Sequence, residues 1–122
     1  MSSENWRPVL SAPAERDLTE ITRWTTENFG ARQAIVYCDL ILEALMQLRL
    51  GPEVPGARPR PELGLLLYTL NVARRGKPGR HFLLYRPRDG RVIEILRVLH
   101  QSMDIERHAP LGGTGADTPS TS

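Results

Sequence analysis

The chain has 122 residues, of which 40% are hydrophobic and 25% are charged, a composition ordinary for one globular domain. Its single cysteine, Cys38, excludes an internal disulfide framework and a multi-cysteine metal site, and we expect it to be a small buried side chain on a helix. No stretch approaches the ~20 apolar residues of a membrane span, and no signal-peptide pattern opens the chain. We therefore expect a cytoplasmic protein with no membrane partner.

The net charge is only +2, but basic side chains gather in the second half. Between Arg74 and Arg97 there are eight basic and two acidic residues. This excess makes an anionic partner plausible for that half. The alternative is a coding bias toward arginine, because Lys77 is the only lysine in the chain.

The chain opens with a polar leader, residues 1–5, which we expect to be flexible. Trp6–Leu10 can form a short strand, and Pro8 confines that strand to an edge or a bulge. Ser11 is a suitable N-cap for a following helix, with Pro13 in the first turn, where its missing N–H costs nothing.

Two amphipathic helices are predicted next. The first has apolar positions at steps of three and four and ends at Gly30, the expected C′ residue: Ala14, Leu18, Ile21, Thr25 and Phe29. The second has a wider stripe and ends near Leu50: Ala34, Ile35, Cys38, Ile41, Leu42, Leu45 and Leu48. Because about one glycine separates them, they should form an antiparallel helical hairpin. Trp24 and Tyr37 fall beside the stripes, which favours packing at the edge of the core.

Pro52–Pro61 holds four prolines and a glycine, which indicates a loop. Most of Leu65–Arg75 is predicted to be a strand, and Gly76–Gly79 a turn. The strongest strand predictions are Arg80–Arg86 and Arg91–Leu99.

The Asp89–Gly90 pair within Pro87–Gly90 is a strong hairpin signal between those two strands. Leu99–Asp104 is expected to close the sheet, and Ile105–His108 to add one helical turn.

The predicted order is β-α-α-β-β-β. It describes an α+β domain in which an N-terminal edge strand and an antiparallel helical hairpin pack on a mainly antiparallel sheet of three to four strands. We expect a single domain over residues 6–108, followed by a disordered tail over 109–122 that is rich in Gly, Thr and Ser.

Both faces of the predicted hairpin are apolar. Strict alternation gives one face Phe82, Leu84, Ile93, Ile95 and Leu99, with Arg80, Arg86, Arg91 and Arg97. It gives the other face His81, Leu83, Tyr85, Val92, Leu96 and Val98, with Glu94 and His100. Leaving one face in water would forfeit several kcal/mol. Since two helices cover one face, we expect the second either to meet another chain or to be covered by the Pro52–Pro61 loop.

Four motifs, spread over most of Leu10 to His108, resemble the ParE branch of the ParE/RelE superfamily of bacterial type II toxins. They are Ala14-x-x-Asp17-Leu18-x-x-Ile21-x-x-Trp24, Phe29-Gly30-x-x-x-Ala34-x-x-Tyr37, Gly79-Arg80-His81-Phe82-x-x-Tyr85-Arg86 and Glu94-Ile95-x-Arg97-Val98-Leu99-His100-x-x-Met103-Asp104. The Leu-His-x-x-Met-Asp segment is more similar to ParE than to RelE. The leader, the proline-rich loop and the long tail depart from the pattern.

The resemblance implies a toxin that poisons DNA gyrase, traps cleaved DNA, blocks replication and serves plasmid or chromosome stabilisation. It also implies a hetero-oligomer with a ParD-like antitoxin, which pairs a ribbon-helix-helix half with a tail that wraps the toxin. The two together would repress their operon, so operator DNA would be bound only through the antitoxin.

Candidate binding residues follow from the same resemblance. For the gyrase contact they are Arg80, Arg97, His100, Met103 and Asp104. For the antitoxin contact they are Leu83, Tyr85, Val92, Leu96, Val98 and Trp24. A structural alternative exists for the closing segment, in which Asp104 caps a turn, Met103 packs and His100 bonds a loop.

A RelE-like, ribosome-dependent mRNA endoribonuclease is the alternative function. Its charge stabilisers and acid–base groups would come from Arg80, Arg97, His81, Tyr85 and His100. The predicted alternation separates Arg80 and Arg97 from His81 and Tyr85, so we expect no catalytic residues and no enzyme activity. A second alternative is a non-toxic protein-binding module of the same fold.

Bound cofactors and metals are not expected. His81, His100 and His108 lack the spacing of a zinc motif, so we predict no metal. The chain has neither a glycine-rich phosphate loop nor a nucleophile turn, so we expect no cofactor.

Overall fold

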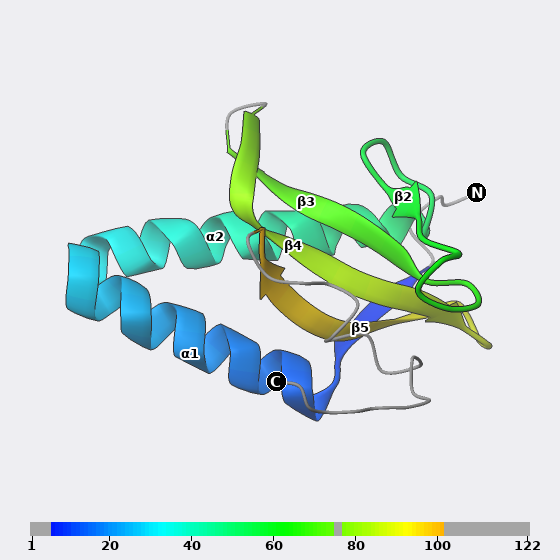
Figure 1. The fold of residues 1–122 in the computed structure, drawn as a ribbon, viewed down its shortest axis with the longest axis horizontal. Coiled ribbons are helices and arrows are strands. Elements are labelled where there is room, and N and C mark those ends of the chain that lie inside the picture. Colours follow the sequence, from blue (N-terminus) through cyan, green and yellow to red (C-terminus); the bar gives the residue numbers. More distant parts are fainter. Residues whose placement is uncertain (1–5, 75–76, 102–122) are drawn as a thin grey trace.

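The computed structural model describes residues 6–74 and 77–101. In chain order the elements are β1 (Arg7–Leu10), α1 (Ala12–Phe29), α2 (Ala31–Gln47), the 3₁₀ turn η1 (Leu48–Leu50), β2 (Arg58–Pro59), β3 (Tyr68–Arg74), β4 (Lys77–Arg88) and β5 (Val92–His100). The strands form one sheet in the order β1-β5-β4-β3-β2, and both helices lie on the same side of it (Figure 1). The predicted α+β architecture is confirmed.

Two details of the sheet differ from the prediction. A fifth strand is present because the two-residue β2 pairs with Tyr68 and Thr69 at the edge of β3. Lys77–Gly79 belongs to β4 rather than to a turn, since the ladder to β3 continues to the pair Arg74–Lys77. The leader, the end of the closing segment from Ser102, the predicted helical turn and the tail lie outside the described residues.

The start of the fold follows local sequence signals. β1 lies at the edge of the sheet, parallel to β5, as Pro8 requires. Ser11 is the N-cap of α1, and its hydroxyl accepts a hydrogen bond from the backbone N–H of Ala14. Gly30 has φ of 94° and is the single residue between the helices. The predicted helical hairpin is therefore confirmed.

A bulge interrupts the hairpin of β4 and β5. Leu84 pairs with Arg97 but Tyr85 pairs with Ile95, so Leu96 is an extra residue on β5. A bulged residue shifts the alternation of side chains by one position. Strict alternation was therefore wrong for the residues before Arg97 on β5.

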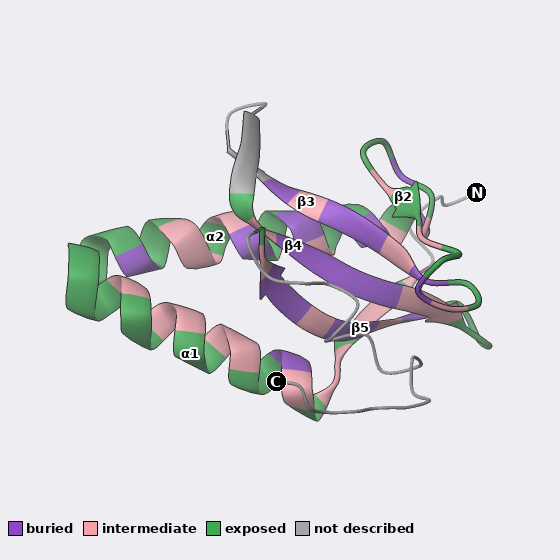
Figure 2. Ribbon diagram, viewed as in Figure 1, coloured by how far each residue is buried: buried purple, intermediate pink, exposed green. Residues whose placement is uncertain are grey.

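The shift changes which side chains share a face. Ile93 and Ile95 pack in the helix-side core with Leu83, Tyr85 and Val98. Leu96 lies in the second apolar cluster, which is made of Leu63, Leu67, Phe82, Leu84, Leu96 and Leu99. Figure 2 shows the middle of the sheet buried along β4 and β5, whereas the outer surfaces of both helices are exposed.

The second apolar cluster decides between the two expectations for the second face. Leu63 and Leu67, which follow the proline-rich loop, pack against Phe82, Leu84 and Leu99. Leu84 and Leu99 are fully buried. The chain therefore covers this face itself, through residues that lie just beyond the Pro52–Pro61 loop, and the expectation that another chain meets it is wrong. Neither helix within the described ranges is long and apolar enough to cross a membrane.

Candidate functional site

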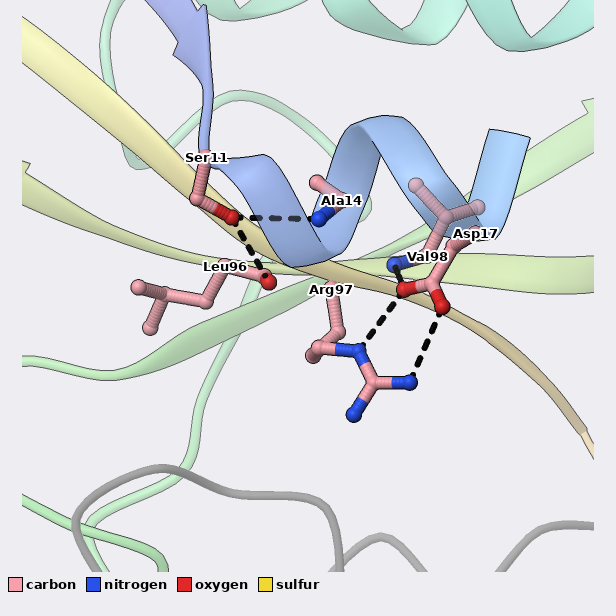
Figure 3. Close-up of polar contacts among 6 residues, drawn as sticks. All are labelled: Ser11, Ala14, Asp17, Leu96, Arg97 and Val98. Atoms are coloured by element: carbon pink, nitrogen blue, oxygen red, sulfur yellow. Dashed lines mark hydrogen bonds and ion pairs between the residues drawn. The ribbon is translucent and has the colours of Figure 1, made fainter. Parts of the chain in front are cut away.

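One edge of β5 is capped by side chains instead of a strand. β1 pairs with β5 only as far as Leu10 and Ile95. Beyond that point the hydroxyl of Ser11 donates to the carbonyl of Leu96 at 3.0 Å. The carboxylate of Asp17 accepts the backbone N–H of Val98 at 2.9 Å (Figure 3). The first turns of α1 thus satisfy polar groups that the edge of the sheet would leave unpaired.

Asp17 also binds Arg97 through two hydrogen bonds (Figure 3). Arg97 Nε lies 2.8 Å from Oδ2, and Nη2 lies 2.9 Å from Oδ1, a bidentate pair that is mostly shielded from solvent. Hydrogen bonding to Asp17 raises the pKa of the Arg97 guanidinium. Arg97, predicted to contact the target, is therefore engaged in fixing α1 to β5. The sequence singled out Asp17 only as part of a motif, without its partner.

The helix junction and the start of β4 form a second feature, here called the junction surface: Trp24, Phe29, Arg80 and His100. Trp24 and Phe29 are about half exposed, with ring centroids 5.6 Å apart in an edge-to-face arrangement. The guanidinium carbon of Arg80 lies 5.9 Å from the centroid of Phe29. Aromatic residues and arginine dominate the binding energy of protein interfaces, so this surface has a suitable composition for one.

A polar contact supports the junction surface from the side of α2. Tyr37 Oη lies 2.6 Å from His81 Nδ1, and the rings of His81 and His100 are 5.1 Å apart and nearly perpendicular. Burial, together with smaller effects of the nearby His100 and Arg80, lowers the pKa of His81 to about 4. His81 is thus neutral at pH 7. The sequence predicted edge packing for Tyr37 but not this partner.

Most of the residues predicted to contact the antitoxin are buried. Leu83, Tyr85 and Val98 lie in the helix-side core, and Leu96 lies in the second apolar cluster. This part of the prediction is corrected, because these side chains offer no surface to a partner. Two other members of the set remain accessible: Trp24 is exposed and Val92 is half-buried.

Tyr85, one of the acid–base candidates, lies apart from Arg97. The hydroxyl of Tyr85 donates to the carbonyl of Pro52 at 2.7 Å, and burial raises its pKa. Arg97 pairs with Leu84 of the second apolar cluster, whereas Tyr85 belongs to the helix-side core. The described residues hold no group of three His, Cys, Asp or Glu side chains placed to bind a metal ion.

Part of the basic charge of the hairpin is neutralised within the chain. Glu94 accepts hydrogen bonds from Arg86 at 3.1 Å and from Arg88 at 2.6 Å. Burial raises the pKa of Glu94, but the hydrogen bonds from Arg88 and Arg86 outweigh it and lower the pKa overall. Glu94 pairs across the ladder with Arg86, so it lies on the same face as this arginine, contrary to the predicted alternation. Met103 and Asp104 lie outside the described residues.

Comparison with known proteins agrees with this architecture. The family described as "ParE toxin of type II toxin-antitoxin system, parDE" matches residues 9–105. Toxin ParE1 of Mycobacterium tuberculosis is 30% identical over 102 residues, covering 84% of this chain and 96% of that protein. Toxin ParE of Escherichia coli is 29% identical over 97 residues, covering 80% of this chain and 86% of that protein.

A solved structure shares the fold. It is described as the chromosomal ParDE TA system from P. aeruginosa and aligns with a TM-score of 0.56 at 22% identity, covering 81% of this chain and 98% of that one. The family match and the ParE1 relative place the chain among the toxins of type II toxin–antitoxin systems. Within that class, the chain belongs to the ParE family.

Proposed function

We propose that this chain inhibits DNA gyrase and is held inactive by a ParD-like antitoxin. The observation that carries the proposal is the family match, which runs from within β1 to beyond the end of β5. Relatives in M. tuberculosis and E. coli that align over most of their length are ParE toxins. The exposed aromatic residues and Arg80 of the junction surface supply a contact area of suitable composition.

In this proposal Arg80 and His100 contact gyrase. Both lie at the same end of the β4–β5 ladder, where Arg80 accepts the backbone hydrogen bond of Gln101 and His100 pairs with His81. Met103 and Asp104 of the closing motif would extend the contact. Arg97 acts indirectly, because its pairing with Asp17 holds α1 against the sheet.

The antitoxin partner would form a hetero-oligomer with this chain and would carry any contact to operator DNA. Of the residues first proposed for its contact, Trp24 and Val92 are placed where a partner can reach them. We expect no catalytic residue, since the chain would act by binding its target.

Purified chain added to gyrase tests the proposal. We expect loss of supercoiling and accumulation of cleaved DNA. Unaffected gyrase together with mRNA cut on ribosomes would instead support the RelE-like endoribonuclease. Normal growth after induced expression without an antitoxin would support the non-toxic binding module.

A further inference from the structure

Basic side chains gather at the tip of the β4–β5 hairpin, where β1 pairs with the start of β5. Val92 pairs with Arg88 of β4 on one side and with Arg7 of β1 on the other, so one row of residues crosses three strands. In the next row Glu94 pairs with Arg86. Four arginines therefore lie in this corner of the sheet, and we call them the tip arginines: Arg7, Arg86, Arg88 and Arg91.

Three of the tip arginines lie on the face of the sheet that points away from the helices. Ile93 packs in the helix-side core, so its neighbours in β5 and their partners on β1 and β4 lie on the outer face. On that face Arg7 and Arg88 are exposed, and Arg86 is half-buried. Arg91 is exposed in the turn, and its carbonyl accepts the backbone N–H of Arg7 at 2.9 Å, which fixes β1 beside the turn.

The acids at the tip neutralise only part of this charge. The carboxylate of Glu94 accepts from Arg86 Nε and from Arg88 Nη1, and each guanidinium keeps further N–H groups for another acceptor. Arg7 and Arg91 have no ion-pair partner among the residues that the structure describes. Because four arginines stand against Glu94 and one acid in the turn, the tip keeps a net positive charge.

A hollow of about 460 Å³ opens at the same place. Its lining is apolar at Val9 and Val92 and charged at Arg88, Asp89 and Glu94. The hollow has room for a phosphate group beside Arg88. Since Glu94 is already bonded to two guanidiniums, it holds them in position at the hollow.

The composition of the tip favours a nucleic-acid duplex as the anionic partner. Arginine binds phosphate through two N–H groups at once. Neighbouring tip arginines lie about 7 Å apart along a strand and about 10 Å apart across two strands, and a duplex carries one charge per about 1.7 Å of its axis. Single strands are instead bound by stacking bases on aromatic side chains, and neither β1 nor the segment Arg86–Glu94 contains an aromatic residue.

We propose that the tip arginines bind the phosphate backbone of duplex DNA without reading its sequence. Backbone contacts position a protein on DNA but carry no base information, so recognition of an operator still belongs to the antitoxin. The choice of DNA as the duplex rests on the function proposed above, whereas the pattern of cations rests on the structure.

The tip is separate from the proposed gyrase contact. The turn between β4 and β5 lies at the opposite end of the molecule from the helix junction at Gly30 (Figure 1). Arg80 and Arg88 are eight residues apart on β4, which corresponds to roughly 26 Å. One chain can therefore contact gyrase at one end of this ladder and DNA at the other.

The first test measures fluorescence anisotropy of a labelled duplex of about 20 base pairs and arbitrary sequence. We expect the full chain to bind it, and the affinity to fall about 40-fold between about 50 and 200 mM salt, the dependence expected for about three phosphate contacts. The double substitution Arg7→Gln, Arg91→Gln should weaken binding about tenfold at the lower salt and leave only about a fourfold loss over the same range. Affinity that does not change with salt would overturn the proposal.

Arg32→Gln, Arg58→Gln is the matched control. It removes the same charge from exposed positions on α2 and β2. Because charges more than about 10 Å from the bound DNA are screened at 0.1 M salt, its affinity should stay within about twofold of the wild type. Equal losses in the two double variants would overturn the proposal, since binding would then follow the net charge and not the tip. Urea denaturation of both variants checks that they remain folded.

Two further probes separate duplex DNA from other polyanions. Single-stranded RNA of the same length and vesicles that contain phosphatidylserine should both bind more weakly than the duplex at the same salt. The tip offers no aromatic side chain for stacking and no amphipathic helix to enter a lipid surface. Stronger binding of either probe would assign the tip to that ligand and overturn the proposal.

Chemical modification of arginine provides a readout at the site itself. Saturating duplex should protect the tip arginines from phenylglyoxal, while Arg32 and Arg58 stay reactive, as mass spectrometry of the modified chain would report. Protection of the two control arginines without protection of the tip would place the DNA elsewhere and overturn the proposal. None of these assays contains gyrase, so their failure leaves the proposed gyrase inhibition standing, and the reverse also holds.

Discussion

The two halves of α1 carry out different tasks. In the first half, Asp17 and the preceding N-cap Ser11 form hydrogen bonds to the edge of β5, and Ala14 is fully buried. In the second half, Trp24 and Phe29 are half exposed, and the side-chain hydrogen bonds of Thr26 and Asn28 stay within the helix. The start of α1 therefore fixes the helix to the sheet, whereas its end supplies exposed side chains to the junction surface. Substitutions in the first half should affect stability, and those in the second half should affect binding.

The largest loss of stability is expected from substitution of Asp17. Asp17→Ala should lower the free energy of unfolding by about 3 kcal/mol, because Arg97 and the N–H of Val98 lose their acceptor. Urea denaturation measures this. Glu20→Ala is the control, since the exposed pair of Glu20 with Arg23 contributes less than about 1 kcal/mol. Equal losses in the two variants would remove the distinction between the halves of α1.

Ser11→Ala should be the next most damaging change. The hydroxyl caps α1 and bonds the carbonyl of Leu96, so its loss should cost about 1–2 kcal/mol. Thr19→Ala removes a hydroxyl that bonds within exposed α1, and the better helix propensity of alanine should make it nearly neutral. Thermal unfolding of both variants compares them. A neutral Ser11→Ala would show that the cap contributes nothing to the scaffold.

Acid should lower the stability of the chain through His81, which lies beside the junction surface. Its pKa is about 4 in the folded chain against an ordinary value of 6.5, so the unfolded chain binds the proton more readily between these values. The contribution of neutral His81 to the free energy of unfolding is then complete above about pH 6.5 and is lost as the pH drops toward 4. Its size is on the order of 1 kcal/mol once solvent screening is allowed for. His81→Gln should remove this component. Identical pH profiles for the variant and the wild type would contradict the assignment.

The smallest stability effects are expected at the end of α1. Trp24→Ala and Phe29→Ala should each change the free energy of unfolding by less than about 1 kcal/mol, because about half of each side chain is already in solvent. Urea denaturation of the same set of variants measures this. A loss above about 2 kcal/mol would mean that these rings belong to the scaffold after all.

Local signals in the sequence predicted much of the fold. The helical hairpin was predicted from the N-cap Ser11, the glycine at Gly30 and the two apolar stripes. The turn before β5 was predicted from Asp89–Gly90. The bulge at Leu96 could not be predicted, because period-two alternation contains no sign of an extra residue. The face assignment of Ile93 and Ile95 failed for that reason.

Contacts between residues far apart in the chain could not be predicted from the sequence. Asp17 and Arg97 are separated by 80 positions, and no local pattern pairs them. Leu63 and Leu67 follow a proline-rich loop, and nothing in their neighbourhood states which face they cover. The buried residues once proposed for the antitoxin were chosen without these contacts. The accessible candidates, Trp24 and Arg80, came from the motifs.

A gyrase cleavage assay with two arginine variants tests the role of the junction surface most directly. Arg80 and Arg58 are both exposed, but Arg58 lies in β2 at the opposite edge of the sheet from β1 and α1. The wild-type chain and Arg58→Ala should trap cleaved DNA equally, whereas Arg80→Ala should need about tenfold more protein with its unfolding midpoint unchanged. Cleaved DNA that never accumulates with the wild-type chain, or equal potency of the three proteins, would contradict the account.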